Sequence, residues 1–347
     1  MRRKCFALLL AIALLLLSGC GFEYLQAEQA EMPGTALQVS FLDVGQADAA
    51  LVCCEGEYML IDGGNVDDGP YVVTSLQERG VQSLAYVVNS HCDEDHCGGL
   101  TDVLEAFDAA HVFSSTTAYS TRAFTNFAAA AQAQRTPIEI PSPGDTFRLG
   151  SAEVTMLGPL RDYGNNNENS IVLRIDYGET SFLFTGDIGL TAEDELVESG
   201  ADLHATVLKV AHHGSAGSSG YVFLRGVMPE YGVISVGAGN DYGHPTDAAL
   251  SRLRDADVTL YRTDLQGTVT AVSDGKTVSF VTERSADESD INPTILDRAS
   301  SYIGNVNSKV FHRDDCGSLP SEKNRVVFDS YQDALDAGYT PHKSCLG

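Results

Sequence analysis

A run of potential metal ligands directly after an apolar stretch constrains the fold of this chain more than any other feature. Leu84–Val88 reads as a strand and leads into His91-Cys92-Asp93-Glu94-Asp95-His96, which Cys97-Gly98-Gly99 follow. Paired glycines let the backbone turn sharply from a strand into a helix, so imidazole and carboxylate groups crowd at the strand end. Such crowding is costly in a desolvated turn unless a cation neutralises it. The run therefore predicts a divalent metal site, and the alternative is a solvated acidic loop with two incidental histidines.

Short β-like runs alternate with helical ones over residues 37–281. Amphipathic stretches at Tyr71–Arg79, Ala192–Ser199 and Thr246–Ala256 predict helices. The apolar or alternating runs that predict strands are Leu37–Val44, Ala49–Cys54, Tyr58–Ile61, Tyr86–Asn89, Glu153–Leu157, Ser170–Ile175, Ser181–Thr185, Ala205–Val210 and Tyr231–Val236. This order indicates an α+β domain in which two sheets pack face to face with helices outside, although a doubly wound α/β fold would show the same order.

The ligand run resembles the His-x-His-x-Asp-His signature of the metallo-β-lactamase superfamily, with Asp93 in place of the second histidine. That variant is typical of the hydrolase domain of the ComEC DNA-uptake proteins. Further motifs agree in order and spacing, namely Val39–Asp48, Ile61–Gly64, Asn169–Leu173, Phe184–Asp187, Leu208–Ser215 and Gly243–Pro245. The resemblance covers residues 37–281 and implies a metallo-β-lactamase αββα sandwich over this range.

The resemblance also implies which residues hold metal. His91 and Asp93 would face one metal position, Asp95 and His96 a second, and Asp187 would bridge the two. Either His212 or His213 would complete the second position. Divalent cations in such a site lower the pKa of water toward neutrality and neutralise charge developing on a phosphoryl oxygen. We therefore expect one or two divalent ions, with Asp95 and Asp187 essential for catalysis.

Two departures from the superfamily pattern affect the first metal position. No histidine occurs between His111 and His204, so a ligand that many superfamily members supply there must come from Glu168, Asn169 or water. A centre with one metal is the alternative. Because Asp93 replaces an imidazole by a harder oxygen ligand, the preference moves away from Zn²⁺ toward Mn²⁺ or Mg²⁺.

Two single residues carry weaker expectations. His244 lies on a glycine-rich turn in Gly243-His244-Pro245, where we expect it to contact substrate, and a loop histidine without a role is the alternative. Lys209 precedes the histidine pair on an expected strand. A phosphate contact is conceivable there, but we interpret Lys209 as an exposed structural lysine.

The N-terminus predicts export and lipid anchoring. Three basic residues at 2–4 precede an apolar run, Cys5–Leu17, that is too short to cross a bilayer comfortably as a mature helix. Leu17-Ser18-Gly19-Cys20 resembles the cleavage site of bacterial lipoproteins, so residues 1–19 would be removed and Cys20 lipidated, with 20–36 as a tether. The protein would then be a membrane lipoprotein on the extracytoplasmic face. An ordinary signal peptide with a chance cysteine is the alternative.

A second group of ligands lies in the tail. The acidic segment 282–300 predicts a linker, and residues 301–347 are too few to build much core without a staple. His312-x₃-Cys316 and His342-x₂-Cys345 predict a structural Zn²⁺ site with mixed nitrogen and sulfur ligands. The segment resembles the Ada-type metal-binding domain, which more often has Cys where this chain has His342. A Cys316–Cys345 disulfide is the alternative.

These features favour an extracytoplasmic, metal-dependent phosphodiesterase acting on DNA, in competence or in processing of nutrient DNA. The DNA assignment follows from the resemblance alone. A formal net charge of −26 repels polyanions, so DNA must be drawn in locally by metal ions. One rival is a hydrolase of another ester, such as a lactone, a thioester or a cell-wall phosphocholine ester. Another is a surface protein that captures DNA without cleaving it. No protein partner is predictable.

Overall fold

The computed structural model describes residues 36–293 and 301–346, apart from 315, 329 and 330. The expected signal peptide, Cys20 and almost all of the expected tether lie outside the described residues. Within the described part of the chain, no helix has both the length and the hydropathy needed to span a membrane.

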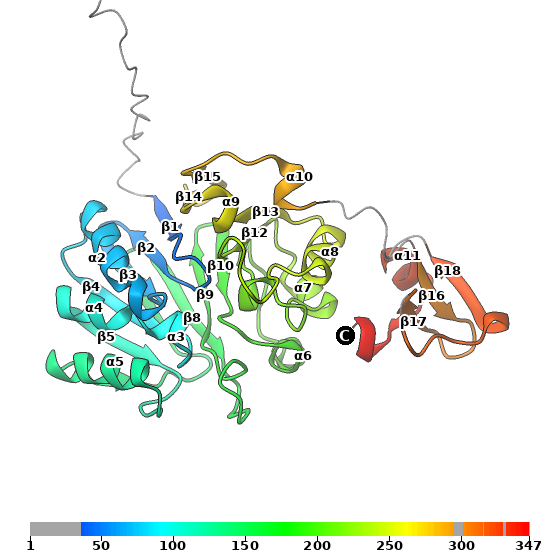
Figure 1. Cartoon of the computed structure of the whole chain (residues 1–347), viewed down its shortest axis with the longest axis horizontal. Helices are drawn as coiled ribbons and strands as arrows, with labels where there is room; N and C mark the ends of the chain where they lie inside the picture. The colour runs from blue at the N-terminus through cyan, green and yellow to red at the C-terminus, as the bar shows by residue number, and fades with distance from the viewer. Residues whose placement is uncertain (1–35, 294–300, 315, 329–330, 347) are drawn as a thin grey trace, which may run out of the picture. The chain divides into compact units, whose positions relative to one another are not determined.

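Two mixed sheets form the centre of residues 36–293 (Figure 1). The first sheet has the strand order β15-β14-β1-β2-β3-β4-β5-β6. Its strands are β1 Leu37–Phe41, β2 Ala50–Cys54, β3 Glu57–Ile61, β4 Leu84–Asn89, β5 Ala109–Ser114, β6 Ile138–Glu139, β14 Val269–Ser273 and β15 Val278–Thr282. The late strand β14 pairs antiparallel with β1, so the chain returns to this sheet after building the other one.

The second sheet has the strand order β13-β12-β11-β10-β9-β8-β7. Its strands are β7 Thr146–Leu149, β8 Ala152–Gly158, β9 Val172–Tyr177, β10 Thr180–Phe184, β11 Val207–Lys209, β12 Tyr231–Ile234 and β13 Thr259–Arg262. Strands β10 to β13 run parallel to one another, so their carboxyl ends meet at one edge of the sheet. That edge is where side chains from different strands can be gathered into one site.

Helices cover the outer face of each sheet, which gives four layers (Figure 1). The helices on the side of the first sheet are α2 Gly69–Glu78, α4 Leu100–Ala106 and α5 Arg122–Ala133, and those on the side of the second are α6 Leu190–Ser199, α7 Tyr221–Val227 and α8 Asp247–Asp255. Short helical turns complete this part of the chain: η1 Val66–Asp68, α3 Glu94–Cys97, η2 Ala211–Gly214, α9 Thr263–Gln266 and α10 Glu288–Ile291. The predicted sandwich is confirmed, and the doubly wound alternative is wrong.

Strand periodicity explains the layers. In β10, Phe182 and Phe184 point into the core between the two sheets, whereas Leu183 points into the core under the helices of the second sheet. In β3, Met59 and Ile61 join the core between the sheets. Successive side chains of a strand point to opposite faces, so both faces of each sheet are apolar and must be covered.

The acidic segment after β15 is not wholly a linker. Glu283 accepts a hydrogen bond from the backbone N–H of Thr268, and Arg254 donates to the carbonyl of Pro293. Helix α10 buries Ile291 in the core under the helices of the second sheet. The buried Ile291 and these hydrogen bonds together hold this stretch against the sandwich.

Residues 301–346 form a small separate sheet with the order β18-β16-β17-β19. Its elements are β16 Tyr302–Asn305, β17 Val310–Arg313, η3 Glu322–Asn324, β18 Arg325–Phe328, α11 Tyr331–Asp336, β19 Thr340–Pro341 and α12 Lys343–Leu346. Few side chains in this part are buried and apolar, and Phe311, Ala334 and Leu346 are among them. So small a core agrees with the expectation that this segment needs a staple.

Candidate active site

The ligand run begins where β4 ends. Ser90 and His91 follow the strand, and Asp93 precedes the short helix α3, so the run turns back on itself within a few residues. Gly98 and Gly99 permit this turn, because an added Cβ at Gly98 would lie 2.4 Å from the nitrogen of Val66, and one at Gly99 would lie 2.1 Å from the carbonyl oxygen of Gly63. Only glycine fits where two backbone segments approach so closely.

The second sheet brings the remaining residues. Asp187 follows β10, the pair His212 and His213 follows β11 in η2, and His244 lies in the loop after β12. Both histidines of the pair have a positive φ, 51° and 53°, so the backbone is strained at this point. All these residues therefore sit at the carboxyl ends of neighbouring parallel strands.

Side chains from the two sheets converge in one small volume. Asp187 Oδ1 lies 3.4 Å from His96 Nε2, and Asp187 Oδ2 lies 3.7 Å from His213 Nε2. Asp95 Oδ2 lies 3.3 Å from His213 Nε2 and 3.9 Å from His96 Nε2. His91 Nε2 lies 3.5 Å from the Oδ2 atom of Asp93. The structure thus gathers the residues expected to hold metal.

The donor atoms fit a metal centre. Among the described residues, the Nε2 atoms of His91, His96 and His213 and the Oδ1 atom of Asp187 are buried without a hydrogen-bond partner. Buried polar atoms are costly when left unpaired, and here all four face one another. Two overlapping triads have ligand atoms within 4.8 Å of one another, namely His91, His96 and Asp187, and Asp95, His96 and His213. Imidazole and carboxylate donors of this kind suit Zn²⁺ or Mn²⁺.

Geometry distinguishes His213 from His212. His213 is 2% exposed, and its Nδ1 lies 2.9 Å from the carbonyl oxygen of Ser235, which turns Nε2 toward Asp95 and Asp187. A backbone acceptor on the far nitrogen is the usual support of a metal-binding histidine. His212 has a side chain that is 33% exposed and lies at the rim, with Nε2 3.6 Å from Asp187 Oδ2. His213 is therefore the better ligand of the pair.

Asp62 is a supporting residue to which the sequence analysis gave no role. Its Oδ1 accepts a hydrogen bond from the backbone of Ser90 at 2.7 Å, and its Oδ2 accepts one from the Ser90 hydroxyl at 2.7 Å. The same Oδ2 lies 2.9 Å from His96 Nδ1. This carboxylate therefore orients His96 so that its Nε2 faces the centre. The only signal in the sequence was its place in the Ile61–Gly64 motif.

The interpretation of Lys209 as an exposed lysine is wrong. Lys209 is 3% exposed, and its Nζ lies 2.7 Å from Asp48 Oδ2. Asp48 Oδ1 lies in turn 3.5 Å from His213 Nδ1. Burial alone would raise the pKa of Asp48, but Lys209 and His213 hold it far below its usual value. Lys209 therefore offsets a carboxylate that lies behind the metal-facing side chains.

The charges of the centre depend on one another. Burial alone would raise the pKa of Asp187, but His96 and His213 hold it well below its usual value. Burial would lower the pKa of His213, but Asp187 and Asp48 raise it to about 10. In the same way Asp187 and Asp62 raise the pKa of His96. Without a cation, protons on the histidines neutralise the buried carboxylates.

His244 lies at the rim of the centre. The centroid of its ring is 5.7 Å from that of His212, and Tyr242 stacks on it with centroids 5.8 Å apart. Its Nδ1 is buried and has no hydrogen-bond partner among the described residues. Burial lowers the pKa of His244, so the ring is neutral near pH 7. This position is compatible with the expected contact with substrate.

Glu168 and Asn169, which were expected to replace the missing histidine, form hydrogen bonds elsewhere in the chain. Glu168 accepts hydrogen bonds from the backbone N–H groups of Gly189 and Ala192 at the start of α6. Asn169 Oδ1 accepts a bond from the backbone of Tyr163 at 2.8 Å. Neither side chain is free to face the first metal position. Instead the side-chain amide of Asn166, in the same loop, donates a hydrogen bond to Asp93.

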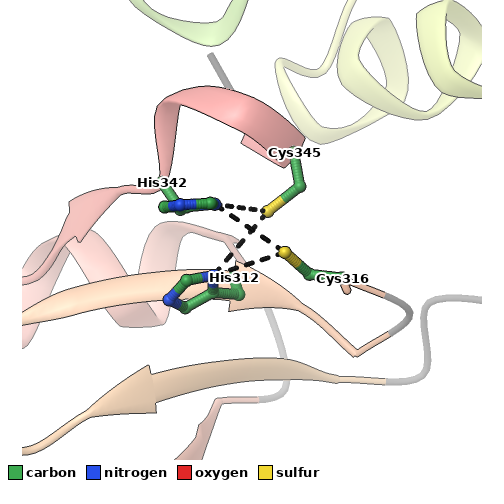
Figure 2. Close-up of side chains that lie close together, drawn as sticks. All are labelled: His312, Cys316, His342 and Cys345. Carbon is green, nitrogen blue, oxygen red and sulfur yellow. Dashed lines mark hydrogen bonds between the residues drawn. The ribbon is translucent and has the colours of Figure 1, made fainter. Parts of the chain in front are cut away.

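The four tail residues form a second site (Figure 2). Cys316 Sγ lies 3.4 Å from His312 Nδ1 and 3.7 Å from His342 Nδ1, and Cys345 Sγ lies 3.4 Å and 4.0 Å from His342 and His312. Tetrahedral Zn²⁺ with ordinary bond lengths places nitrogen and sulfur ligands about 3.5 Å apart. Both cysteines are free thiols, and both imidazoles face the sulfurs. This cluster can hold a metal ion, and the geometry does not support the disulfide alternative.

Metal binding at the main centre should release protons. His213 has a pKa of about 10, against an ordinary value of 6.5, so it is protonated in the metal-free protein at neutral pH and must lose that proton to bind a cation. Its ion pairs stabilise the metal-free fold below pH 6.5, and this contribution is lost as the pH rises toward about 10. Affinity for Mn²⁺ should therefore increase over that range. Calorimetry in buffers of different ionisation enthalpy measures the protons released, and His213→Gln should release fewer; equal heats in all buffers would contradict this prediction.

The tail cluster should bind one soft metal ion independently of the main centre. Full-length protein titrated with Co²⁺ should develop a thiolate charge-transfer band, because two of the four ligands are sulfur. Cys316→Ser or Cys345→Ser should remove the band, whereas Cys53→Ser, which changes a cysteine outside the cluster, should leave it intact. If the unreduced protein shows no band and lacks two reactive thiols, the disulfide alternative is correct.

Comparisons with known proteins identify the family of the chain. A family model described as the metallo-beta-lactamase superfamily matches residues 42–238. ComE operon protein 3 of Bacillus subtilis is 27% identical over 276 residues, and competence protein ComA of Neisseria gonorrhoeae is 34% identical over 259 residues. Each alignment covers 74% of this chain but only 36% and 34% of those relatives. The chain thus spans a minor part of their length.

A solved structure with a similar arrangement is the metallo-beta-lactamase fold protein YhfI from Bacillus subtilis. It aligns with a TM-score of 0.48 at 12% identity, over 69% of this chain and 100% of that one. The family match by sequence spans more than half of the chain and includes the His91–His96 run, Asp187 and His213. By its sequence and by the centre it builds, this chain belongs to the metallo-β-lactamase superfamily.

Proposed function

We propose that this chain is a metal-dependent phosphodiesterase that acts on DNA outside the cytoplasmic membrane. The observation that carries the proposal is the position of Asp187 beside two sets of ligand atoms. It lies 3.4 Å from His96 and 3.7 Å from His213, and it shares a triad with His91. Two adjacent metal positions with a shared carboxylate suit in-line displacement at phosphorus, as in phosphatases and nucleases.

The residues of the centre have separate parts in this chemistry. Divalent cations bound there would activate water near neutral pH and offset charge on the phosphoryl oxygens. Asp187 and Asp95 have lowered pKa values, so both stay ionised and remain able to hold cations. His244 is neutral near pH 7 and borders the centre, so it can donate a hydrogen bond to a phosphate oxygen.

A groove beside the centre supports an extended substrate. It has a volume of about 490 Å³ and is lined by Tyr119, Arg161, Asn165 and Asn166 among others. One of these lining residues, Asn166, bonds to Asp93, so the groove lies next to one of the expected ligands. Tyr119 is 39% exposed and offers a ring on which a nucleobase can stack. A small ester would not need this space.

The relatives support DNA as the substrate. One of them is named as a competence protein and another as a ComE operon protein, and we extend the association with competence to this chain. The net charge of −26 works against binding of a polyanion. Cations in the centre would supply the local attraction, so weak binding of DNA in the presence of a chelator is part of the proposal.

Two other functions use the same residues differently. A lactone, a thioester or a phosphocholine ester could be hydrolysed by the same centre, and the fold alone does not separate these substrates. A surface protein that captures DNA without cleaving it would leave the buried ligands His91, His96, Asp187 and His213 without a role. The groove and the named relatives favour DNA over the other esters, and the buried ligands favour cleavage of DNA over its capture.

We further propose that the protein is exported and held at the membrane by lipid on Cys20, which the apolar run and the residues just before Cys20 support. Expression in a bacterium with Cys20→Ser should move the protein from the membrane fraction to the medium or periplasm, because one residue carries the whole anchor. Labelling with a radioactive fatty acid measures the modification directly. Label that persists in the variant would refute this assignment.

Asp187→Asn tests the catalytic proposal. The amide keeps the size of the side chain but removes the charge beside two metal positions, so hydrolysis should fall by about 100-fold or more, because loss of a residue that only supports a ligand already costs about 10- to 100-fold. Single- and double-stranded DNA, bis(p-nitrophenyl) phosphate, a lactone and a thioester should be assayed with Mn²⁺, Mg²⁺ and Zn²⁺. Asp257→Asn changes an exposed charge at a site remote from the ligands and should have no effect. Turnover of the lactone or thioester but of no phosphodiester would favour the rival enzyme.

A further inference from the structure

Asn166 is placed where the structure must compensate for a missing histidine. The first metal position is faced by His91 and Asp93, with Asp187 on the other side. Glu168 and Asn169, which belong to the same loop, bond to other parts of the chain. The side chain that does reach the ligand run from this loop is that of Asn166.

Both polar atoms of the Asn166 side-chain amide form hydrogen bonds. Its Nδ2 donates a hydrogen bond of 2.7 Å to Asp93 Oδ1, and its Oδ1 accepts one of 3.2 Å from the backbone N–H of Cys92. The amide therefore links the backbone of the ligand run to one of its carboxylates. Asp93 precedes α3 but forms no side-chain cap with that helix, so it has no such restraint from its own element.

The two hydrogen bonds of Asn166 determine which oxygen of Asp93 is available to a metal ion. Oδ1 is engaged by Asn166, whereas Oδ2 lies 3.5 Å from His91 Nε2 and faces the first metal position. The side chain of Asp93 is 43% exposed, so without Asn166 it would rotate into solvent at little cost. A carboxylate held in this way offers Oδ2 to a cation while Oδ1 accepts the hydrogen bond from Asn166.

The second position is built differently. Its histidines are almost completely buried, and each is oriented by a buried partner: Asp62 for His96 and the carbonyl of Ser235 for His213. The first position also has a buried histidine, His91, whose Nδ1 lies 3.1 Å from the Ser90 hydroxyl. Its carboxylate, Asp93, is more exposed than Asp95 of the second position, 43% against 31%, and is held by one neutral amide. Ligands with less support bind metal less tightly.

We propose that Asn166 is a positioning residue that holds Asp93 as a one-oxygen ligand, and that the first metal position is consequently the weaker of two unequal sites. The inference rests on the proposed function only in that the centre holds divalent cations. Its test is metal binding, so it can fail while hydrolysis is observed, or succeed when no substrate has been found.

Titration of metal-free, full-length protein with Mn²⁺, followed by electron paramagnetic resonance and calorimetry, measures both positions. The His/Cys cluster of the tail has soft ligands that disfavour Mn²⁺, so it should not compete. The wild type should show a tight and a weak class of site. Asn166→Ala should raise the Kd of the weak class by about 10-fold or more and leave the tight class unchanged.

Two controls keep this outcome specific. Asn165→Ala changes a neighbouring asparagine whose side-chain Oδ1 accepts a hydrogen bond from the backbone N–H of Glu168, so it should leave both classes unchanged. In an Asp93→Asn background, Asn166→Ala should have no further effect on the weak class, because the two residues act as one unit. Thermal unfolding with a chelator shows whether each variant folds. A single class in the wild type, or an equal loss of both classes in Asn166→Ala, would overturn the proposal.

Discussion

The contact between His96 and Asp187 joins the two halves of the sandwich at the point where chemistry is expected. His96 comes from the turn after β4 in the first sheet, and Asp187 follows β10 in the second. Their side chains are almost completely buried and lie 3.4 Å apart. Such a pair is stable only where proton or cation charge offsets the carboxylate. The core between the sheets therefore sets the geometry of the centre.

Polar contacts on the side away from the expected cations support the His96–Asp187 pair. Asp62 orients His96 through a hydrogen bond to its Nδ1. Lys209 offsets the charge of Asp48, with Nζ 2.7 Å from Asp48 Oδ2. Among the described residues, the carboxylates of Asp62 and Asp48 thus have partners behind the centre, whereas Nε2 of His91, His96 and His213 and Oδ1 of Asp187 have no hydrogen-bond partner and face the expected cations. This arrangement pre-organises the ligands, so little reordering is needed when metal binds. The tail cluster lies beside a much smaller core, where we expect a bound metal to contribute to folding itself.

Local sequence was sufficient to predict the metal centre, several helices and the ligands of the tail cluster. The density of ligands at His91–His96 after an apolar strand predicted the centre, because charge cannot be crowded at a buried strand end without compensation. Helix α2 and helix α8 lie within one or two residues of the expected helices, since amphipathic periodicity is a local property. The His312/Cys316 and His342/Cys345 pairs also depend on short spacing. In the two main sheets the strands β5, β6, β7, β13, β14 and β15 were not predicted, because short runs such as Thr259–Arg262 carry little periodic signal.

What the sequence determined by itself was thus the kinds of residue at each strand end and the family they indicate. Tertiary structure decided their roles. It made His213 rather than His212 face the centre, through a carbonyl 22 residues away. It buried Lys209 against Asp48 and brought Asn166 to Asp93 across 73 residues. These contacts arise where loops from different strands meet, and neither spacing nor composition encodes which side chain of a loop points inward.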